Sequence, residues 1–280
     1  HQHMPVESVR IGGTFAVQPP ANAGRYLQVE AAVRDGGAEF SARLLPVGGI
    51  HREQPYRRLL PLEQAVQRWL DEPVGHLEQA IPPEEKLRAA LHGSAVAALF
   101  NQVQLSHTGA DISCTSLGNE PAGLAASVTM RAITAAYLFS NTLVVLEITE
   151  EILRALLERC ASYFTLENGT PRVSDAFLAP KVEHYNYDFF AGISYQFDLR
   201  QPVGRRLTRL SRLDGTPLGP GPLRLCTSNY RATGTGGYDA LRTCPVLWRG
   251  SVEMPELVAE YVRANSPVSL PCNGRMEAIW

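Results

Sequence analysis

The sequence predicts an α+β fold in which a mixed β-sheet carries flanking helices. Three features lead to this prediction: residues 1–50 are rich in strand patterns, helical stretches follow, and short strands are interspersed with helices beyond residue 105. With 280 residues, of which 45% are hydrophobic, the chain is long enough for one large domain or two modest ones. It shows no internal repeat and no low-complexity segment.

The N-terminal segment is predicted to be β-structure. An apolar stretch at residues 29–33 precedes Asp-Gly-Gly at 35–37, and a second stretch follows at 40–47, which is typical of a β-hairpin. A piece this short cannot bury a core of its own. We therefore expect residues 1–50 to be the trailing edge of a larger domain.

Two helices are expected next. Apolar residues recur at helical spacing within residues 51–72, and Pro73 ends the pattern. A second helix should follow Pro82 and Pro83, because proline suits the first turn of a helix. The predicted inner faces hold Leu62, Ala65, Val66, Trp69 and Leu70 in the first helix, and Leu87, Leu91, Ala95, Ala98 and Leu99 in the second.

The remaining chain mixes strands and helices. Residues 143–148 form a compact apolar strand, and Thr149 is placed to cap a helix that continues to Cys160. Alternation over 193–199 predicts a half-buried strand, and Asp-Gly at 214–215 predicts a hairpin turn. A further strand is expected at 223–227 and a last helix around 257–262.

Composition excludes several classes of function. The net charge is −2, and lysine occurs only at positions 86 and 181, so no basic surface for nucleic acid is indicated. No apolar run reaches the length of about 18 residues that a membrane-spanning helix needs. The five cysteines are widely spaced without a C-x-x-C pair, which argues against a zinc site and leaves one disulfide open.

Two local features could carry binding. Glycines at 234, 236 and 237 follow a predicted strand, but the sequence lacks the residues that define a P-loop or a dinucleotide-binding turn. Phe139 and Tyr230 lie in polar loop sequence, where an aromatic ring can stack on a flat base. The alternatives are a plain turn for the glycines and ordinary core packing for the two rings.

Four stretches carry a family resemblance. They are residues 108–114, residues 128–131 with 138–143, residues 185–195, and residues 228–232 with the glycines that follow. In order and separation they resemble the C-terminal domain of the 5'-nucleotidase family over about residues 73–250. The nearest branch is similar to the bacterial bifunctional 2',3'-cyclic-nucleotide 2'-phosphodiesterase/3'-nucleotidases.

The resemblance implies a division of labour within a longer enzyme. An N-terminal metallophosphoesterase domain would do the chemistry, and this chain would supply its β remnant (1–50), a linker helix (51–72) and a nucleotide-recognition domain (73–280). The base would lie between Phe139 and Tyr230, and the 234–237 loop would pass the ribose. The substrate-binding residues implied are Phe139, Asn141, Asn186, Gly192, Asn229, Tyr230, Gly234 and Gly236.

Two departures from the family pattern bear on the substrate. The 5'-nucleotidase branch has an arginine within the stretch that matches residues 108–113, and none is present here. That branch also has an aspartate on the ribose hydroxyls where this chain has Gly236. A missing carboxylate is consistent with 3'- or cyclic-phosphate substrates. The alternative is that Gly236 serves a turn with positive φ.

The N-terminus resembles the end of the family's metal site. His1 and His3 match its Gly-His-x-His motif and would be the last ligands of two divalent metal ions in the intact enzyme; a purification remnant is the alternative. The chain alone is expected to hold no metal and to be inactive. The resemblance implies a periplasmic, secreted or cell-wall location. The alternatives are a 5'-nucleotidase or UDP-sugar hydrolase domain, a stand-alone nucleoside-binding module and a dinucleotide-dependent oxidoreductase.

Overall fold

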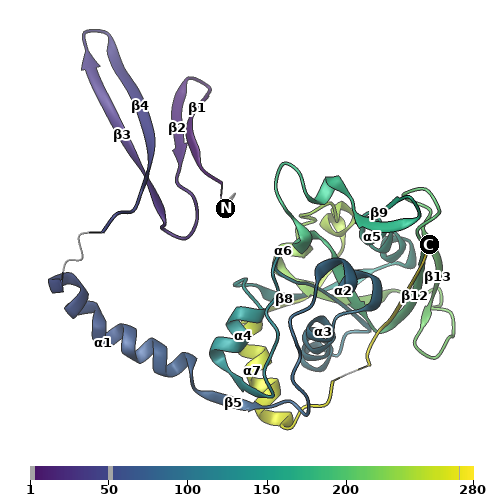
Figure 1. The fold of residues 1–280 in the computed structure, drawn as a ribbon. Helices are drawn as coiled ribbons and strands as arrows, with labels where there is room; N and C mark the ends of the chain where they lie inside the picture. The colour runs from purple at the N-terminus through teal and green to yellow at the C-terminus, as the bar shows by residue number, and fades with distance from the viewer. Residues whose placement is uncertain (1–3, 50–52, 271) are drawn as a thin grey trace. The chain divides into compact units, whose positions relative to one another are not determined.

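The computed structural model describes residues 4–49, 53–270 and 272–280 (Figure 1). The chain divides into two compact units, His1–Glu63 and Gln64–Trp280. The boundary falls inside helix α1 (Glu53–Leu70), so the predicted linker helix is shared between the units.

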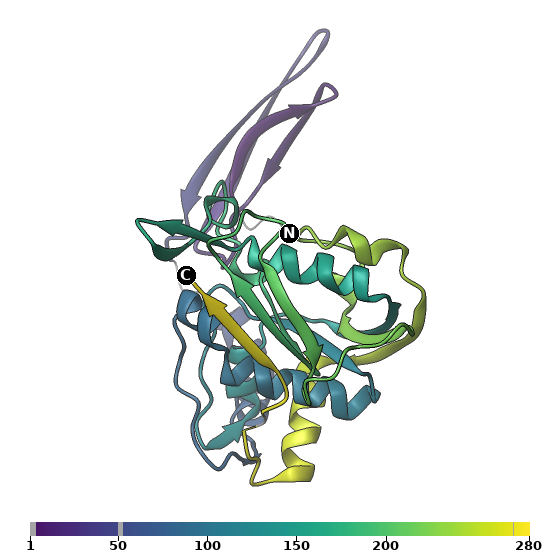
Figure 2. The same ribbon diagram turned by 90° about the vertical axis from the view of Figure 1, so that its right-hand side faces the viewer.

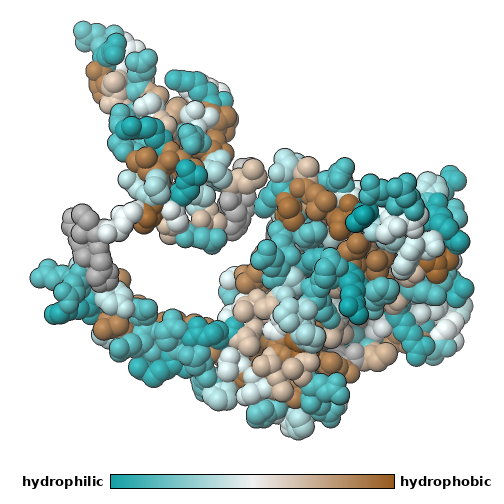
Figure 3. Space-filling model, in the orientation of Figure 1, coloured by the Kyte–Doolittle hydropathy of each residue, from teal (hydrophilic) through white to brown (hydrophobic). Residues whose placement is uncertain are grey.

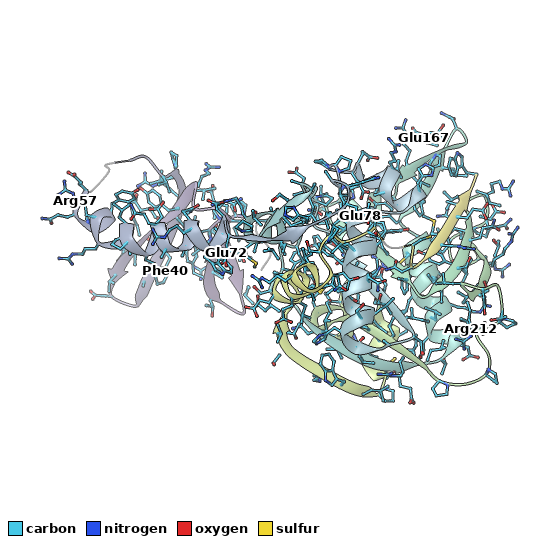
Figure 4. All side chains as sticks on the ribbon, turned by 90° about the horizontal axis from the view of Figure 1, so that it is seen from below. Phe40, Arg57, Glu72, Glu78, Glu167 and Arg212 are labelled. Carbon is cyan, nitrogen blue, oxygen red and sulfur yellow. The ribbon has the colours of Figure 1, made fainter. Side chains whose placement is uncertain are left out.

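The first unit contains two β-hairpins, whose strands are β1 (Val6–Ile11), β2 (Thr14–Gln18), β3 (Arg25–Arg34) and β4 (Gly37–Pro46). The predicted hairpin at 29–47 is confirmed: β3 and β4 pair without interruption from Arg25↔Pro46 to Arg34↔Gly37. Phe40 lies in the second hairpin (Figure 4), and its ring stacks on Phe15 of the first, with the centroids 5.6 Å apart.

The first unit has little interior. None of its described residues is buried, and Ile11 and Val33 are 67% and 82% exposed. Apolar side chains accordingly appear on the surface of the hairpins in Figure 3. Two hairpins are too few to enclose a core, as the sequence led us to expect.

Helix α1 differs from the expectation in its packing. It begins by Glu53, ahead of Pro61, and none of its residues is buried. The predicted apolar face is present in the sequence, but Leu62, Val66 and Trp69 are each more than 40% exposed. Helical periodicity identified the face correctly and could not identify a partner for it.

The second unit is built on a five-stranded sheet of order β11-β6-β14-β8-β15. Strand β14 runs parallel to β6, and every other neighbouring pair is antiparallel, so the predicted mixed sheet is confirmed. The strands span β6 (Ile112–Ser116), β8 (Thr142–Ile148), β11 (Asp188–Ala191), β14 (Leu223–Ser228) and β15 (Val246–Glu253). The predicted strands at 143–148 and 223–227 are β8 and β14.

Helices cover this sheet. They are α2 (Lys86–His92), α3 (Ala95–Thr108), α4 (Met130–Ala136), α5 (Glu150–Ala161), α6 (Asn229–Ala232) and α7 (Met254–Asn265), with 3-10 turns at Asp175–Phe177, His184–Asn186 and Asp239–Thr243. Thr149 caps α5 as predicted, because its hydroxyl accepts the Ile152 N–H at 3.3 Å.

The single helix predicted after Pro83 is wrong. It is split into α2 and α3 at Gly93, whose φ of 91° cannot continue a right-handed helix. Ser94 then caps α3 by accepting the Ala97 N–H at 3.2 Å. Both were recognisable as a stop followed by a start.

A three-stranded sheet of order β13-β12-β16 stands beside the first (Figure 2, with β16 in yellow). Its strands are β12 (Ile193–Asp198), β13 (Leu207–Arg212) and β16 (Arg275–Ile279); the short pairs β5 (Pro73–His76) with β7 (Ser127–Thr129) and β9 (Phe164–Glu167) with β10 (Thr170–Val173) complete the unit.

Two predictions for this region need correction. Strand β12 is more buried than half-buried: even Gln196 and Asp198 are only 6% exposed, because β12 is the central strand of its sheet. The Asp214–Gly215 turn exists, with Gly215 at φ 87°, but it closes no hairpin. The strands on either side of it, β13 and β14, belong to different sheets.

The cysteines and helices complete the description. All five cysteines lie in the described part of the chain, and each is a free thiol, so the open disulfide is not formed. Among the helices of the described residues, none is long and apolar enough to cross a membrane.

Candidate functional site

One edge of the five-stranded sheet gathers the predicted residues. Strand β14 ends at Ser228, which pairs with Leu143 at the start of β8. Strand β11 starts at Asp188, which pairs with Ser116 at the end of β6. The segments before β8, after β14 and before β11 therefore meet at the same edge. They carry Phe139 and Asn141, Asn229 and Tyr230, and Asn186, respectively.

The loop before β8 holds Phe139 against the core. Its ring makes edge contacts with Tyr137 and Tyr185, at centroid distances of 6.5 and 6.2 Å. Asn141 donates from Nδ2 to the Tyr137 hydroxyl at 3.4 Å, and its carbonyl accepts the Met254 N–H at 2.9 Å. Burial raises the pKa of Tyr137 to about 12, with the Asn141 bond opposing, so this phenol stays protonated.

Tyr230 lies on α6, directly after β14. Ser228 caps this short helix by accepting the Arg231 N–H at 3.1 Å. Asn229 Oδ1 accepts the Thr142 N–H at 3.2 Å, which ties the Tyr230 helix to the Phe139 loop. The Tyr230 side chain is 42% exposed, so its ring remains accessible.

A third aromatic residue, Tyr185, completes the cluster and was missed at the sequence level. Its hydroxyl donates to Glu183 at 3.0 Å and accepts from Lys181 at 3.1 Å. Burial, followed by the hydrogen bond to Glu183 and the charge of Glu183, raises the pKa of Tyr185, and Tyr230 adds to the shift. Tyr185 opens the third stretch of the family resemblance, and that position was the available indication.

Asn186 lies beneath the surface of the site. It is 4% exposed, and its Nδ2 donates to Glu183 at 2.9 Å. Its carbonyl accepts the Tyr238 hydroxyl at 3.1 Å. Its Oδ1 has no hydrogen-bond partner among the described residues, although it is buried. An unpaired buried amide oxygen is unfavourable and is most often met beside a functional group or an ordered water.

The glycine loop needs glycine for its conformation. Gly234, Gly236 and Gly237 have φ values of 80°, 82° and 88°. A Cβ atom on Gly236 would lie 2.3 Å from Asn186 Oδ1 and 2.4 Å from an Arg231 nitrogen. The conformational explanation left open above therefore accounts for Gly236. Its lack of a carboxylate is no longer evidence for one class of phosphate.

A buried ion pair underlies the cluster, and the sequence did not predict it. Arg231 and Asp188 are 2% and 1% exposed, and both carboxylate oxygens accept from the guanidinium at 2.8 Å. The guanidinium also lies 4.1 Å above the Tyr238 ring. The pair joins the start of β11 to α6, and so fixes two of the three segments that form the site.

Gly192 lies apart from the other predicted residues. Its N–H donates to Asn273 at 2.6 Å, and a Cβ atom would approach the Asp111 carbonyl to 2.2 Å. Asp111 pairs with Arg224 at the start of β14, whereas Tyr230 follows its end. The four steps from Arg224 to Ser228 separate these ends by about 13 Å. Gly192, at φ 89°, lets the chain bend from β11 into β12.

The predicted metal ligands His1 and His3 lie outside the described residues. Within the described ranges, no group of three or more His, Cys, Asp or Glu side chains is placed to hold a metal ion. A cavity of about 230 Å³ occurs elsewhere, at the outer edge of β11. It is lined in part by His92, Ser94, Asn101, Phe190, Tyr195 and Arg275, none of which belongs to the aromatic cluster.

Comparison with known proteins agrees with this arrangement. The family described as 5'-nucleotidase, C-terminal domain, matches residues 73–243. The trifunctional nucleotide phosphoesterase protein YfkN of Bacillus subtilis is 27% identical over 139 residues, which is 45% of this chain and 9% of that protein. The 2',3'-cyclic-nucleotide 2'-phosphodiesterase/3'-nucleotidase of Haemophilus influenzae is 23% identical over 258 residues, covering 79% of this chain and 38% of that protein.

A solved structure is also similar. A Staphylococcus aureus protein described as a 5'-nucleotidase, in complex with α-ketoglutarate, superposes with a TM-score of 0.84 at 27% identity. The match covers 99% of this chain and 55% of that one. The present chain thus spans little more than half the length of that protein, and less of the two curated relatives.

Proposed function

The chain belongs to the 5'-nucleotidase C-terminal domain family, and from that premise we propose that it is the substrate-recognition part of a nucleotide phosphohydrolase. The proposed activity of the whole enzyme is that of a 2',3'-cyclic-nucleotide 2'-phosphodiesterase/3'-nucleotidase. The names of the two curated relatives support this choice. The S. aureus neighbour supports the second candidate, a 5'-nucleotidase.

The observation that carries the proposal is the pairing of two aromatic loops at one sheet edge. Phe139 and Tyr230 lie on segments joined by the Asn229–Thr142 hydrogen bond, and Tyr230 is exposed. A nucleoside base would stack between the two rings, a contact that contributes about 1–3 kcal/mol per base. The amide of Asn141 would face the edge of the base, and the glycine loop would face the ribose.

The reaction itself is assigned to residues outside this chain. We propose that a metallophosphoesterase domain precedes the chain in the same polypeptide, with residues 1–50 as its last β-strands. Bound there, two divalent metal ions would activate water and stabilise the leaving oxygen. His1 and His3 are the residues of this chain that would help hold them. This chain's own task is to bind and orient the nucleoside. Its proposed location is periplasmic, secreted or cell-wall associated.

The base sandwich is tested by titrating the chain with adenosine and 3'-AMP in a calorimeter. Phe139→Leu and Tyr230→Leu keep apolar bulk but remove the flat ring, so each should raise Kd about 5- to 150-fold. Tyr26→Leu is the matched control, because Tyr26 is 48% exposed in the first unit. Unchanged affinity in both ring variants would exclude the sandwich.

A further inference from the structure

The glycine loop is held from inside by two arginines. Arg231 uses four of its five N–H donors: two bind Asp188, one binds the Tyr185 carbonyl at 2.9 Å, and one binds the Thr235 carbonyl at 2.6 Å. One side chain therefore contacts the segment that carries Tyr185, the helix that carries Tyr230 and the loop that follows it.

Arg159 of α5 makes the second contact. Its Nε donates to the Gly236 carbonyl at 2.8 Å, and its Nη1 donates to Ser162 at 2.9 Å. The guanidinium is supported from below by the Phe177 ring, 4.2 Å away. Successive carbonyls of the loop, at Thr235 and Gly236, thus accept from two different arginines.

This arrangement leaves the other side of the loop backbone free. The N–H groups of Thr235, Gly236 and Gly237 make no hydrogen bond with any described residue of the chain. The loop is meanwhile closed at both ends, because Gly234 donates to Arg231 and Tyr238 donates to Gly234, at 2.9 and 3.1 Å. Three consecutive unpaired donors in a fixed loop are available to oxygen atoms of a ligand.

We propose that Arg231 and Arg159 are positioning residues of the nucleoside site, which fix the glycine loop so that its free N–H groups and the Tyr230 ring face the ligand together. The inference rests on the proposed function. Neither arginine contacts the ligand: Arg231 is buried, and Arg159 is occupied by the loop carbonyl. Their role is to set the geometry of the groups that do.

Arg206 provides a matched control. It too is buried, at 6% exposure, and donates to backbone carbonyls, at Ala161 and Phe164, at 2.9 and 2.6 Å. It contacts none of the segments that form the aromatic cluster. Replacing either buried arginine by lysine keeps the charge and removes the planar fork of donors, so both variants suffer a similar structural loss.

The experiment compares Arg231→Lys, Arg159→Lys and Arg206→Lys with the wild type, each as the full chain below its melting transition. Kd for adenosine is measured by calorimetry, and exchange of the Gly234 and Tyr238 amides by hydrogen–deuterium exchange. We expect R231K and R159K to raise Kd about tenfold or more and to accelerate exchange at these two amides. R206K should change neither, even where its thermal stability falls as far.

Two results would overturn the positioning role: an unchanged Kd in the two loop variants, or an equal rise of Kd in R206K. Should R231K fail to fold, R159K decides the matter, because Arg159 lies on the outside of the loop and makes no buried ion pair. A wild-type chain that binds no adenosine contradicts the proposed function instead. Amide exchange then still decides whether the two arginines hold the loop.

Discussion

Gly236 shows how a single residue can mislead a reading of substrate preference. Its position invited a comparison with an acid that grips ribose, yet a Cβ atom there would collide with Asn186 and Arg231. Gly215 has a similar φ of 87°, but its missing Cβ would meet nothing within 4 Å. The two glycines together separate the effect of backbone conformation from the effect of space.

We predict that Gly236→Ala is more destabilising than Gly215→Ala. The latter should lose about 1–2 kcal/mol, the usual penalty for a side chain in the left-handed region. The former adds the collision and should weaken 3'-AMP and 5'-AMP alike, because the whole loop moves. Urea unfolding and calorimetry measure both effects. A selective loss of 3'-AMP binding would return Gly236 to a role in substrate choice.

Lys86 gives a prediction about pH. Its amine donates to the Leu117 carbonyl at 3.2 Å, and burial, opposed by Glu84, lowers its pKa to about 7 from the usual 10.5. Its other titratable neighbours are Glu85 and His184; burial and then the charge of Lys86 lower the pKa of His184, so the ring is neutral above pH 7. Below pH 7 the folded chain holds a poorly solvated charge.

Between pH 7 and 10.5 the unfolded chain binds more protons at Lys86 than the folded chain, so this residue makes stability rise with pH. Lys86→Met removes the penalty. Its stabilising effect should be largest at pH 7 and should shrink by up to about 1.4 kcal/mol per pH unit toward pH 8.5. Urea unfolding at both values measures it. An effect that does not vary with pH would show that Lys86 is not buried as a charge.

Individual residues differ in how well the sequence revealed them. Phe139 and Tyr230 stood out because aromatic rings in polar loops are unusual, and the structure brings their loops together. The Arg231–Asp188 pair joins positions 43 residues apart, and nothing in local sequence couples them. Gly192 was grouped with the site by its motif, although a positive φ at a strand bend explains it.

At the scale of elements, periodicity identified helices and strands but not their neighbours. The apolar face of α1 was read correctly from its spacing, yet it is exposed. The break between α2 and α3 was visible as Gly93 followed by Ser94 and was overlooked, because the apolar spacing continues across it. Short-range patterns decide where elements form, and tertiary contacts decide how they are used.

Helix α1 is predicted to bend at Pro61. Proline has no N–H for the carbonyl of Arg57, which weakens the helix there, and the boundary between the units follows within three residues. Beyond it, Arg131 of α4 anchors the helix by donating to Asp71 and Gln67 at 2.7 and 2.6 Å. A hinge at this point would let the two units move relative to each other.

The hinge is measured with spin labels at Ser41→Cys and Ser106→Cys, in a Cys272→Ser background that removes the exposed native thiol. Electron–electron resonance should give a broad distance distribution for the wild-type helix. Pro61→Ala should narrow it by restoring the missing hydrogen bond. Equal widths in the two proteins would mean that α1 is a rigid spacer.

For the whole molecule, the predicted class of fold is confirmed, while the order of strands was beyond sequence reasoning. Mixed strand and helix periodicities indicate α+β architecture. Strand β14, however, inserts between β6 and β8, which precede it by more than 70 residues. Such long-range pairing brings the site together, and local patterns carry no information about it.

The chain alone is predicted not to hydrolyse 2',3'-cyclic AMP or bis-p-nitrophenyl phosphate, with Mn²⁺, Co²⁺ or Zn²⁺ added. His1 and His3 are too few ligands for a two-metal centre, and the described residues offer no cluster of three. Product release is followed over hours against a blank. Turnover that survives purification and disappears on chelation would reveal a catalytic site within these 280 residues.

The central claim is that this chain recognises the nucleoside at the edge of the five-stranded sheet. A crystal structure of the full chain with adenosine tests it most directly. The account predicts the adenine ring between Phe139 and Tyr230, with the ribose beside the loop from Gly234 to Gly237. Adenosine seated instead in the 230 Å³ cavity at the outer edge of β11, with the aromatic cluster empty, would contradict it.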